Sequence, residues 1–296
     1  MAVYVNTNVS SLNGRRYLNN VQNSLTTTYQ RLSSGMRINS AKDDAAGLQI
    51  ADRLTTQING LNQGNRNTND GIALAQTIEG ALDETSSMLQ KIRTLAVQSA
   101  NGTNTKEDRD ALNTEAQSLV DEIGRIATQT KFGGKTLLNG ADTNSIYGSQ
   151  ANPSKGGTLT LQVGANKGDE INFTVANFSM FSKFGGTINT AAYKAGKITL
   201  NTVAGAKEVI SLMDTLISKV DSQRSGLGAI QNRLESSIRN QSNVAANQSD
   251  ARSRIRDADF AEESANLSQQ SIIQQAATSM LMQANSRPQL ALSMLG

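Results

Sequence analysis

The chain has 296 residues, and its 28 basic and 25 acidic residues leave a formal net charge of only +3. It contains no histidine and no cysteine, which excludes a Ser-His-Asp triad, a thiolate nucleophile and the zinc and haem sites that need these side chains. Hydrophobic residues are 37% and aromatic residues 4%, below the roughly 45–50% apolar content of globular chains, so we expect no large aromatic core, no enzyme and no cofactor.

The first 42 residues carry basic side chains and no acidic ones. With tyrosines interleaved, this segment could be a nucleic-acid-binding arm or one face of an amphipathic helix. Apolar residues at spacings of three and four favour the helix, and we expect no nucleic-acid partner. No apolar run reaches about 18 residues, and the start lacks the apolar region of a cleaved signal peptide. We therefore expect no membrane span.

The next segment, residues 43–100, has the pattern of one long helix. It contains no proline, and its apolar residues over 78–96 alternate spacings of three and four, as in helices that pack lengthwise. Asn101-Gly102 is a turn signal, and Thr105 with Asp108 matches the capping box that begins a helix. The sequence predicts a long helix, a turn and a second helix that folds back antiparallel.

The middle of the chain changes character between residues 130 and 202. Turn signals there separate stretches of period-two alternation at 159–163 and 171–175, which predict two β-hairpin-like pieces. Helical spacing returns at about residue 205 and continues to a helix end near Pro288. The expected fold class is mainly α, a long antiparallel helical rod formed by the N- and C-terminal segments, with a small β-hairpin insertion in mid-chain.

The two terminal helices contain few bulky apolar residues. Each would leave an apolar seam exposed on a single copy, and an assembly of many copies would cover it. The assembly residues predicted from this spacing are Leu18, Val21, Leu25, Leu32, Ile273, Ala277, Met280 and Ala284.

Two other patterns have a chemical and a structural interpretation. Gly134-Lys135-Thr136 resembles the end of a phosphate-binding loop, but Gln129 stands where that loop needs a glycine, so a tight turn is favoured. Acidic pairs near residues 43–44, 257–259 and 262–263 could bind a hard cation or form a catalytic pair. Their positions at expected helix starts favour capping, and we expect no metal site.

Several longer stretches are similar to the signatures of bacterial flagellin. Residues 33–47 read SSGMRINSAKDDAAG, residues 69–72 read NDGI, residues 93–100 read RTLAVQSA, and residues 257–261 read DADFA. The similarity covers about residues 1–140 and 203–296.

This resemblance implies a structural subunit that self-assembles into the bacterial flagellar filament, with the hook–filament junction protein of the same family as the alternative. It implies a discontinuous filament-core domain of residues 1–42 and 255–296, and a rod domain of residues 43–254 with a β-rich insertion at about 130–202. It further implies type III export, an extracellular location, and contacts with a cap protein, a junction protein and an export chaperone on the C-terminal helix.

The resemblance also implies a contact with an animal Toll-like receptor through Gln90, Lys91, Leu95 and Glu115. Lys91 stands where recognised members commonly have arginine, so the charge is kept but the planar guanidinium is lost. Because Lys91 and Leu95 are four residues apart on one helix, with Glu115 expected on the antiparallel neighbour, we expect one continuous exposed surface. Arg256 also departs from the family pattern, because an acidic residue is usual there.

Overall fold

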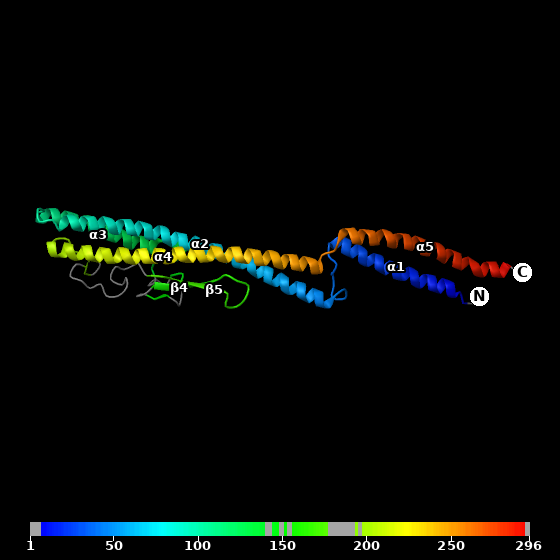
Figure 1. Cartoon of the computed structure of the whole chain (residues 1–296). Coiled ribbons are helices and arrows are strands. Elements are labelled where there is room, and N and C mark those ends of the chain that lie inside the picture. Colours follow the sequence, from blue (N-terminus) through cyan, green and yellow to red (C-terminus); the bar gives the residue numbers. More distant parts are fainter. Residues whose placement is uncertain are drawn as a thin grey trace. The chain divides into compact units, whose positions relative to one another are not determined.

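The computed structural model describes residues 7–139, 144–147, 151–152, 156–176, 193–194 and 197–293. The chain divides into two compact units (Figure 1), residues 1–58 with 246–296, called here the terminal unit, and residues 59–245, called the central unit. The terminal unit is therefore discontinuous in sequence, and the central unit is a single continuous segment between its two parts. The division into filament core and rod predicted from the resemblance uses other boundaries and stays a prediction.

Five helices account for most of the described chain, which confirms the mainly α fold. They are α1 (Val9–Ser34), α2 (Ala45–Ser99), α3 (Lys106–Gln129), α4 (Val203–Arg256) and α5 (Phe260–Ser293). The long helix predicted over residues 43–100 is α2, and the predicted capping box is present at the start of α3, where Thr105 and Asp108 each accept a hydrogen bond from the backbone N–H of the other.

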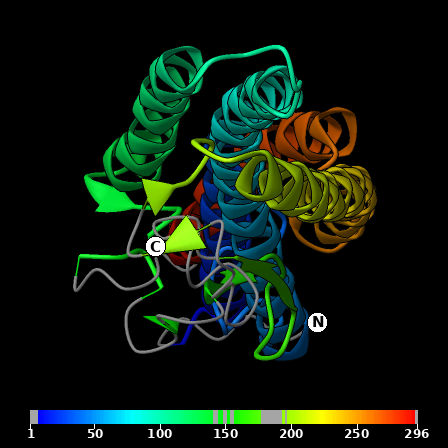
Figure 2. The same ribbon diagram turned by 90° about the vertical axis from the view of Figure 1, so that its left-hand side faces the viewer.

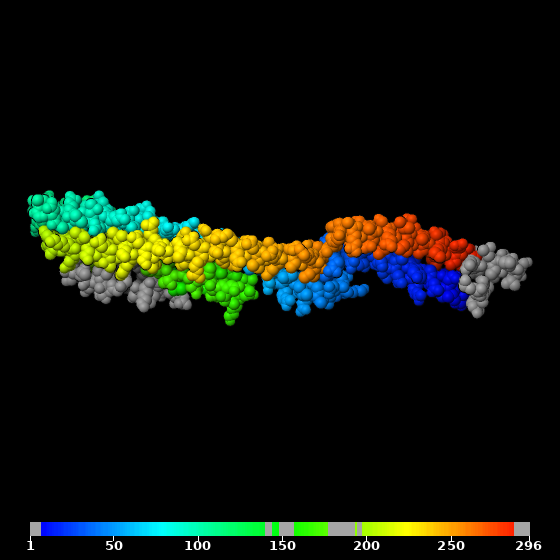
Figure 3. Space-filling view, viewed as in Figure 1, coloured from blue at the N-terminus to red at the C-terminus, as the bar shows by residue number. Residues whose placement is uncertain are grey.

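In the terminal unit, α1 and α5 lie side by side and antiparallel (Figures 1 and 3). The two connectors that follow α1 and precede α5 also pair. The Arg256 carbonyl accepts the backbone N–H groups of Arg37 at 2.7 Å and Ile38 at 3.3 Å, and the Ala258 N–H donates to the Gly35 carbonyl at 3.0 Å. These bonds join the segment after the C-terminal end of α1 to the segment before the N-terminal end of α5.

The signature stretch 33–47 is the turn between α1 and α2. Gly35 ends α1 with φ of 70°, a left-handed conformation that favours glycine. The Asp44 carboxylate accepts the N–H of Gly47 at 2.8 Å and so caps the start of α2. A β-carbon at Gly47 would lie 2.8 Å from the side chain of Ile38, which is buried. The motif therefore encodes a specific helix–turn–helix connection.

The central unit contains the main hydrophobic core. Figure 2 shows α2, α3 and α4 nearly end-on as three neighbouring helices, and apolar residues from all three form one buried cluster. Two ion pairs join α2 and α4, Arg93 with Asp214 at 2.5 Å and Asp83 with Arg224 at 2.9 Å. Arg93 follows Asp83 along α2, whereas its partner Asp214 precedes Arg224 along α4. The two helices are therefore antiparallel.

Short antiparallel strands occupy the mid-chain region. They are β1 (Lys131–Phe132) with β2 (Lys135–Thr136), then β3 (Ala151–Asn152), β4 (Gly156–Gln162) and β5 (Glu170–Val175), and finally β6 (Tyr193–Lys194) with β7 (Lys197–Ile198). The stretches 159–163 and 171–175, predicted as two β-hairpin-like pieces, belong instead to the two strands of one hairpin, β4–β5, in which Leu159 faces Phe173 and Leu161 faces Ile171. None of the helices in the described ranges has the length and apolar character of a membrane span.

The β4–β5 hairpin packs onto glycines of α2. A β-carbon at Gly60 would lie 2.7 Å from that of Ala165, and one at Gly64 would collide with the Val163 carbonyl oxygen. The Asn67 side chain donates to the Gln162 carbonyl at 2.9 Å. The missing side chains therefore let the hairpin backbone approach the helix closely, at the cost that glycine brings to a helix interior.

The prediction that the last helix ends near Pro288 is wrong, because α5 continues to Ser293. Proline has no N–H to donate to the carbonyl four residues earlier, which is that of Ala284. The side-chain amide of Asn8 donates to this carbonyl at 2.7 Å. A residue from the other end of the chain thus supplies the hydrogen bond that the proline removes.

Candidate self-assembly surface

The pairing of α1 with α5 is fixed by polar contacts at both ends. Asn8 donates to Ala284 as described, and the Ser11 hydroxyl bonds the Asn285 side chain at 2.7 Å. At the other end, Arg31 pairs with Glu263 at 3.0 Å, and Glu263 is only 6% exposed. Because breaking a buried pair leaves an uncompensated charge, these contacts set one register between the helices.

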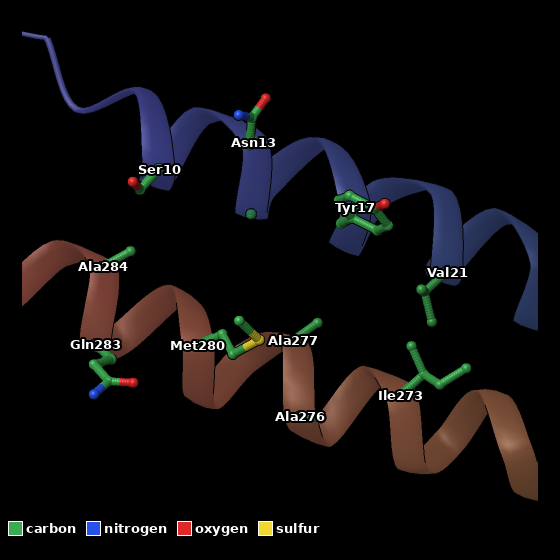
Figure 4. A pocket seen from close by; sticks show the side chains of 11 residues that line it. Ser10, Asn13, Tyr17, Val21, Ile273, Ala276, Ala277, Met280, Gln283 and Ala284 are labelled. Atoms are coloured by element: carbon green, nitrogen blue, oxygen red, sulfur yellow. The ribbon is translucent and has the colours of Figure 1, made fainter. Parts of the chain in front are cut away.

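Along one side of this pair the helices leave an open groove of about 600 Å³. Figure 4 shows Val21 and Ile273 pointing toward one another at one end, and Ala277 and Met280 on the side of α5 that faces α1. Small side chains on α5, those of Ala276, Ala277 and Ala284, leave the space open. The groove is therefore a mainly apolar channel between two helices, and no other element among the described residues covers it.

Several large apolar and aromatic side chains of the groove are exposed. Met280 is 70% exposed and Tyr17 is 67% exposed, and both line the groove. Further large apolar side chains are exposed elsewhere on the same helices, namely Val9, Leu12, Ile272 and Met282. Exposed apolar residues in such numbers mark an interaction surface.

The predicted assembly residues fall in two groups. Five of them line the groove, and these are Val21, Ile273, Ala277, Met280 and Ala284. The others lie elsewhere on α1: Leu25 is buried, and Leu18 and Leu32 are half-buried. That these residues make contacts between copies stays a prediction.

Sequence analysis missed two contributors to the α1–α5 contact. Gly14 has no side chain, and a β-carbon there would lie 3.1 Å from the Leu281 Cδ1 atom. Glu263 was interpreted only as a capping acid, although its carboxylate pairs with Arg31. A glycine within an otherwise helical pattern was the available signal for close helix approach, and an acidic pair on the helix expected opposite the basic first 42 residues was the signal for the ion pair.

Several acidic residues do occupy helix starts or turns, as predicted. The Asp43 carboxylate accepts the backbone N–H groups of Ser40 and Asn39, which hold the pKa of Asp43 below its ordinary value. The Thr105 backbone and hydroxyl groups lower the pKa of Asp108 in the same way. Asp259 accepts the N–H of Ala261 at 2.8 Å near the start of α5. These carboxylates satisfy free N–H groups.

Of the four residues expected to contact a Toll-like receptor, three are exposed and one is buried. Lys91 on α2 and Glu115 on α3 are both exposed and form an ion pair at 3.6 Å, and Gln90 beside them is exposed. Leu95 is 4% exposed and belongs to the main core. The expectation of one exposed surface that includes Leu95 is therefore wrong, because the apolar side of α2 at this point faces α3 and α4.

Arg256 uses its backbone rather than its side chain in the connector pairing. Its carbonyl accepts two N–H groups, whereas its Nε atom is buried and has no hydrogen-bond partner in the described part of the chain. Nothing in the structure explains why arginine replaces the acid here.

The comparisons with known proteins match the two helical ends of the chain. The model of the bacterial flagellin N-terminal helical region matches residues 5–143, and the model of the C-terminal helical region matches residues 210–295. Flagellin B of Vibrio cholerae is 37% identical over 376 aligned positions, with both chains fully covered. The chain belongs to the bacterial flagellin family.

Other similar proteins agree. Flagellin D of Vibrio anguillarum is 38% identical over 377 positions, again with both chains covered in full. Because these alignments are longer than the 296 residues of this chain, the relatives carry residues that this flagellin lacks. A structure titled as a putative flagellar hook-associated protein from Vibrio parahaemolyticus has a TM-score of 0.55 at 17% identity, covering 73% of this chain and all of the other. That likeness concerns the fold alone.

Proposed function

We propose that this chain is the structural subunit of a bacterial flagellar filament and that the α1–α5 groove is a contact between copies. Membership of the flagellin family supports the first part. The observation that carries the second is the open apolar groove beside Tyr17 and Met280, whose side chains are exposed in a single copy. A homopolymer is the simplest partner, because it covers the groove of every copy with a surface from another.

The contact would be heterologous, with the groove of one copy meeting a different surface of the next. Heterologous contacts that do not close into a ring generate open helical filaments, which is the form of a flagellar filament. The exposed apolar residues Val9, Leu12 and Ile272 do not line the groove. They are available for the complementary surface. Burying apolar side chains from both copies supplies about 25 cal/mol per Å² removed from water.

A charge placed in the groove tests this proposal. Ala276 lines the groove and is exposed, so Ala276→Glu adds a carboxylate there without disturbing the buried contacts of α5. The adjacent Gln275 is also exposed but does not line the groove, so Gln275→Glu adds the same charge as a matched control.

Seeded growth, followed by sedimentation and electron microscopy, measures the effect. Burying an unpaired charge costs several kcal/mol, so Ala276→Glu should raise the critical concentration by at least about tenfold, since about 1.4 kcal/mol corresponds to a factor of ten. Gln275→Glu should grow at close to the unmodified rate. Equal growth of both variants would remove the groove from the assembly contact. Failure of the unmodified chain to extend filament seeds would instead favour the junction-protein alternative.

The remaining partners are also part of the proposal. Export through the flagellar type III channel, assembly beneath a cap protein, a junction with the hook and a chaperone bound to α5 would accompany a filament subunit outside the cell. The proposed arrangement places residues 1–42 and 255–296 in the filament core and 43–254 in the rod. For the animal Toll-like receptor, the exposed candidates are Gln90, Lys91 and Glu115, whereas Leu95 contributes only by supporting α2 from within the core.

A further inference from the structure

Sulfur chemistry in this chain is confined to methionine. There is no cysteine, and eight residues are methionine. Among the described ones, Met213 is fully buried, whereas Met280 and Met282 on α5 are 70% and 67% exposed. A mild oxidant reaches exposed thioethers first, and no thiol elsewhere in the chain competes for it.

The two exposed methionines differ in their location. Met280 lines the α1–α5 groove, and Figure 4 shows its thioether on the side of α5 that faces α1, beside Ala277. Met282 is two residues along the same helix and does not line the groove. Because residues two apart on a helix point in directions about 200° apart, the pair offers equal exposure with and without a place in the groove.

We propose that Met280 is a reversible oxidation site that controls filament growth, with peroxide as the oxidant. The inference rests on the proposed function, because it requires the groove to be a contact between copies. In the oxidised form the groove carries a polar sulfoxide where the reduced form offers an apolar thioether. Growth then depends on the redox state of the subunit before it joins the filament.

The chemical step transfers one oxygen atom. The thioether sulfur of Met280 attacks hydrogen peroxide, the O–O bond breaks, an S–O bond forms, and water leaves after proton transfer. Sulfur loses two electrons and the peroxide gains them. The product is a chiral sulfoxide with a strong hydrogen-bond acceptor. Ala277, which lies beside the thioether, cannot donate a hydrogen bond, and the donor groups of the groove lining are those of Ser10, Asn13, Tyr17 and Gln283. A second copy that covers the groove removes water from the sulfoxide and leaves it with these side chains as its only donors in the groove.

The test begins with the full-length monomer treated with hydrogen peroxide. Peptide mass spectrometry measures sulfoxide at each methionine, and seeded growth is then measured after the peroxide is removed. Met280→Leu replaces the thioether with an apolar side chain of similar volume, a change that cores usually tolerate. Met282→Leu is the matched control, with the same substitution on the same helix.

The oxidised unmodified chain and oxidised Met282→Leu should both lose seeded growth by about fivefold or more, because the contact between copies covers a polar sulfoxide that has lost its water. Met280→Leu should grow after the treatment at the rate that the same variant shows without treatment. Methionine sulfoxide reductases should restore growth of the oxidised unmodified chain.

Three results would overturn the inference. Met280→Leu could lose growth as completely as the unmodified chain, which would place the sensitive residue elsewhere. Full growth could persist although Met280 is converted, or Met280 could resist conversion while Met282 is oxidised.

Comparing the peroxide assay with the Ala276→Glu assay separates this inference from the proposed function. If Ala276→Glu blocks growth but oxidation of Met280 does not, the oxidation switch is wrong and the groove contact stands. If Ala276→Glu grows normally, the groove contact fails, and the oxidation switch fails with it. In assembled filaments Met280 should be oxidised more slowly than in monomer, whereas equal rates would contradict both.

Discussion

Substitution of Leu95 provides a direct test of the packing in the central unit. Leu95 is 4% exposed within the α2–α3–α4 core, whereas Val97, two residues later on α2, is 49% exposed. Replacing a buried leucine by alanine costs about 2–5 kcal/mol from lost transfer free energy and the cavity left behind. Leu95→Asp should cost more than Leu95→Ala, because it also buries a carboxylate for which the apolar core offers no partner.

These costs translate into a measurable fall of the unfolding temperature. For a unit of roughly 150–250 residues, each kcal/mol shifts Tm by about 2–4 °C. A cost of about 3 kcal/mol should therefore lower Tm by roughly 6–12 °C for Leu95→Ala. Val97→Asp changes an exposed side chain and should stay within about 0.5 kcal/mol of the unmodified chain.

Thermal unfolding followed by far-ultraviolet circular dichroism measures all three variants on the monomer. If Leu95→Asp and Val97→Asp unfold within about 2 °C of each other, the assignment of Leu95 to the core is refuted. Loss of receptor signalling in Leu95→Asp would then reflect a surface contact. If the large difference is found, such a loss follows from destabilised packing of α2, and Lys91→Ala becomes the informative surface variant.

Two further predictions concern the packing of α2 and the capping of α3. Gly64→Ala should lower the free energy of unfolding by about 1–3 kcal/mol in urea titrations, because its β-carbon would collide with the Val163 carbonyl. Gly80→Ala should raise the free energy of unfolding by about 0.5–1 kcal/mol, because nothing lies within 4 Å of the added β-carbon. The opposite signs would contradict the hairpin contact. The lowered pKa of Asp108 means that its carboxylate stabilises the fold above its ordinary pKa and loses this effect as the pH falls through the lower folded value. The Tm advantage of the unmodified chain over Asp108→Asn should therefore shrink between about pH 5 and pH 3; an advantage independent of pH would exclude the charge as its source.

Local sequence information predicted the helices well because their signals lie within a few residues of each other. The proline-free run predicted α2, and the capping box of Thr105 and Asp108 predicted the start of α3. Alternating residues also predicted the β4 and β5 strands, although not their pairing with each other in one hairpin. The helix end near Pro288 failed because a local rule for proline took no account of Asn8, which lies 276 residues away from Ala284 in the chain.

The sequence by itself therefore determined the family and most of the secondary structure, since motifs, caps and periodicity are properties of neighbouring residues, and the assembly residues that it suggests stay a prediction. Tertiary structure decided which of these residues are accessible. Leu95 is buried because α3 and α4 cover its side of α2, whereas Met280 is exposed because, among the described elements, the groove has walls from α1 and α5 only. Both residues are apolar and both have helical spacing, so only the number of helices packed around each one separates a core residue from a surface that another copy can cover.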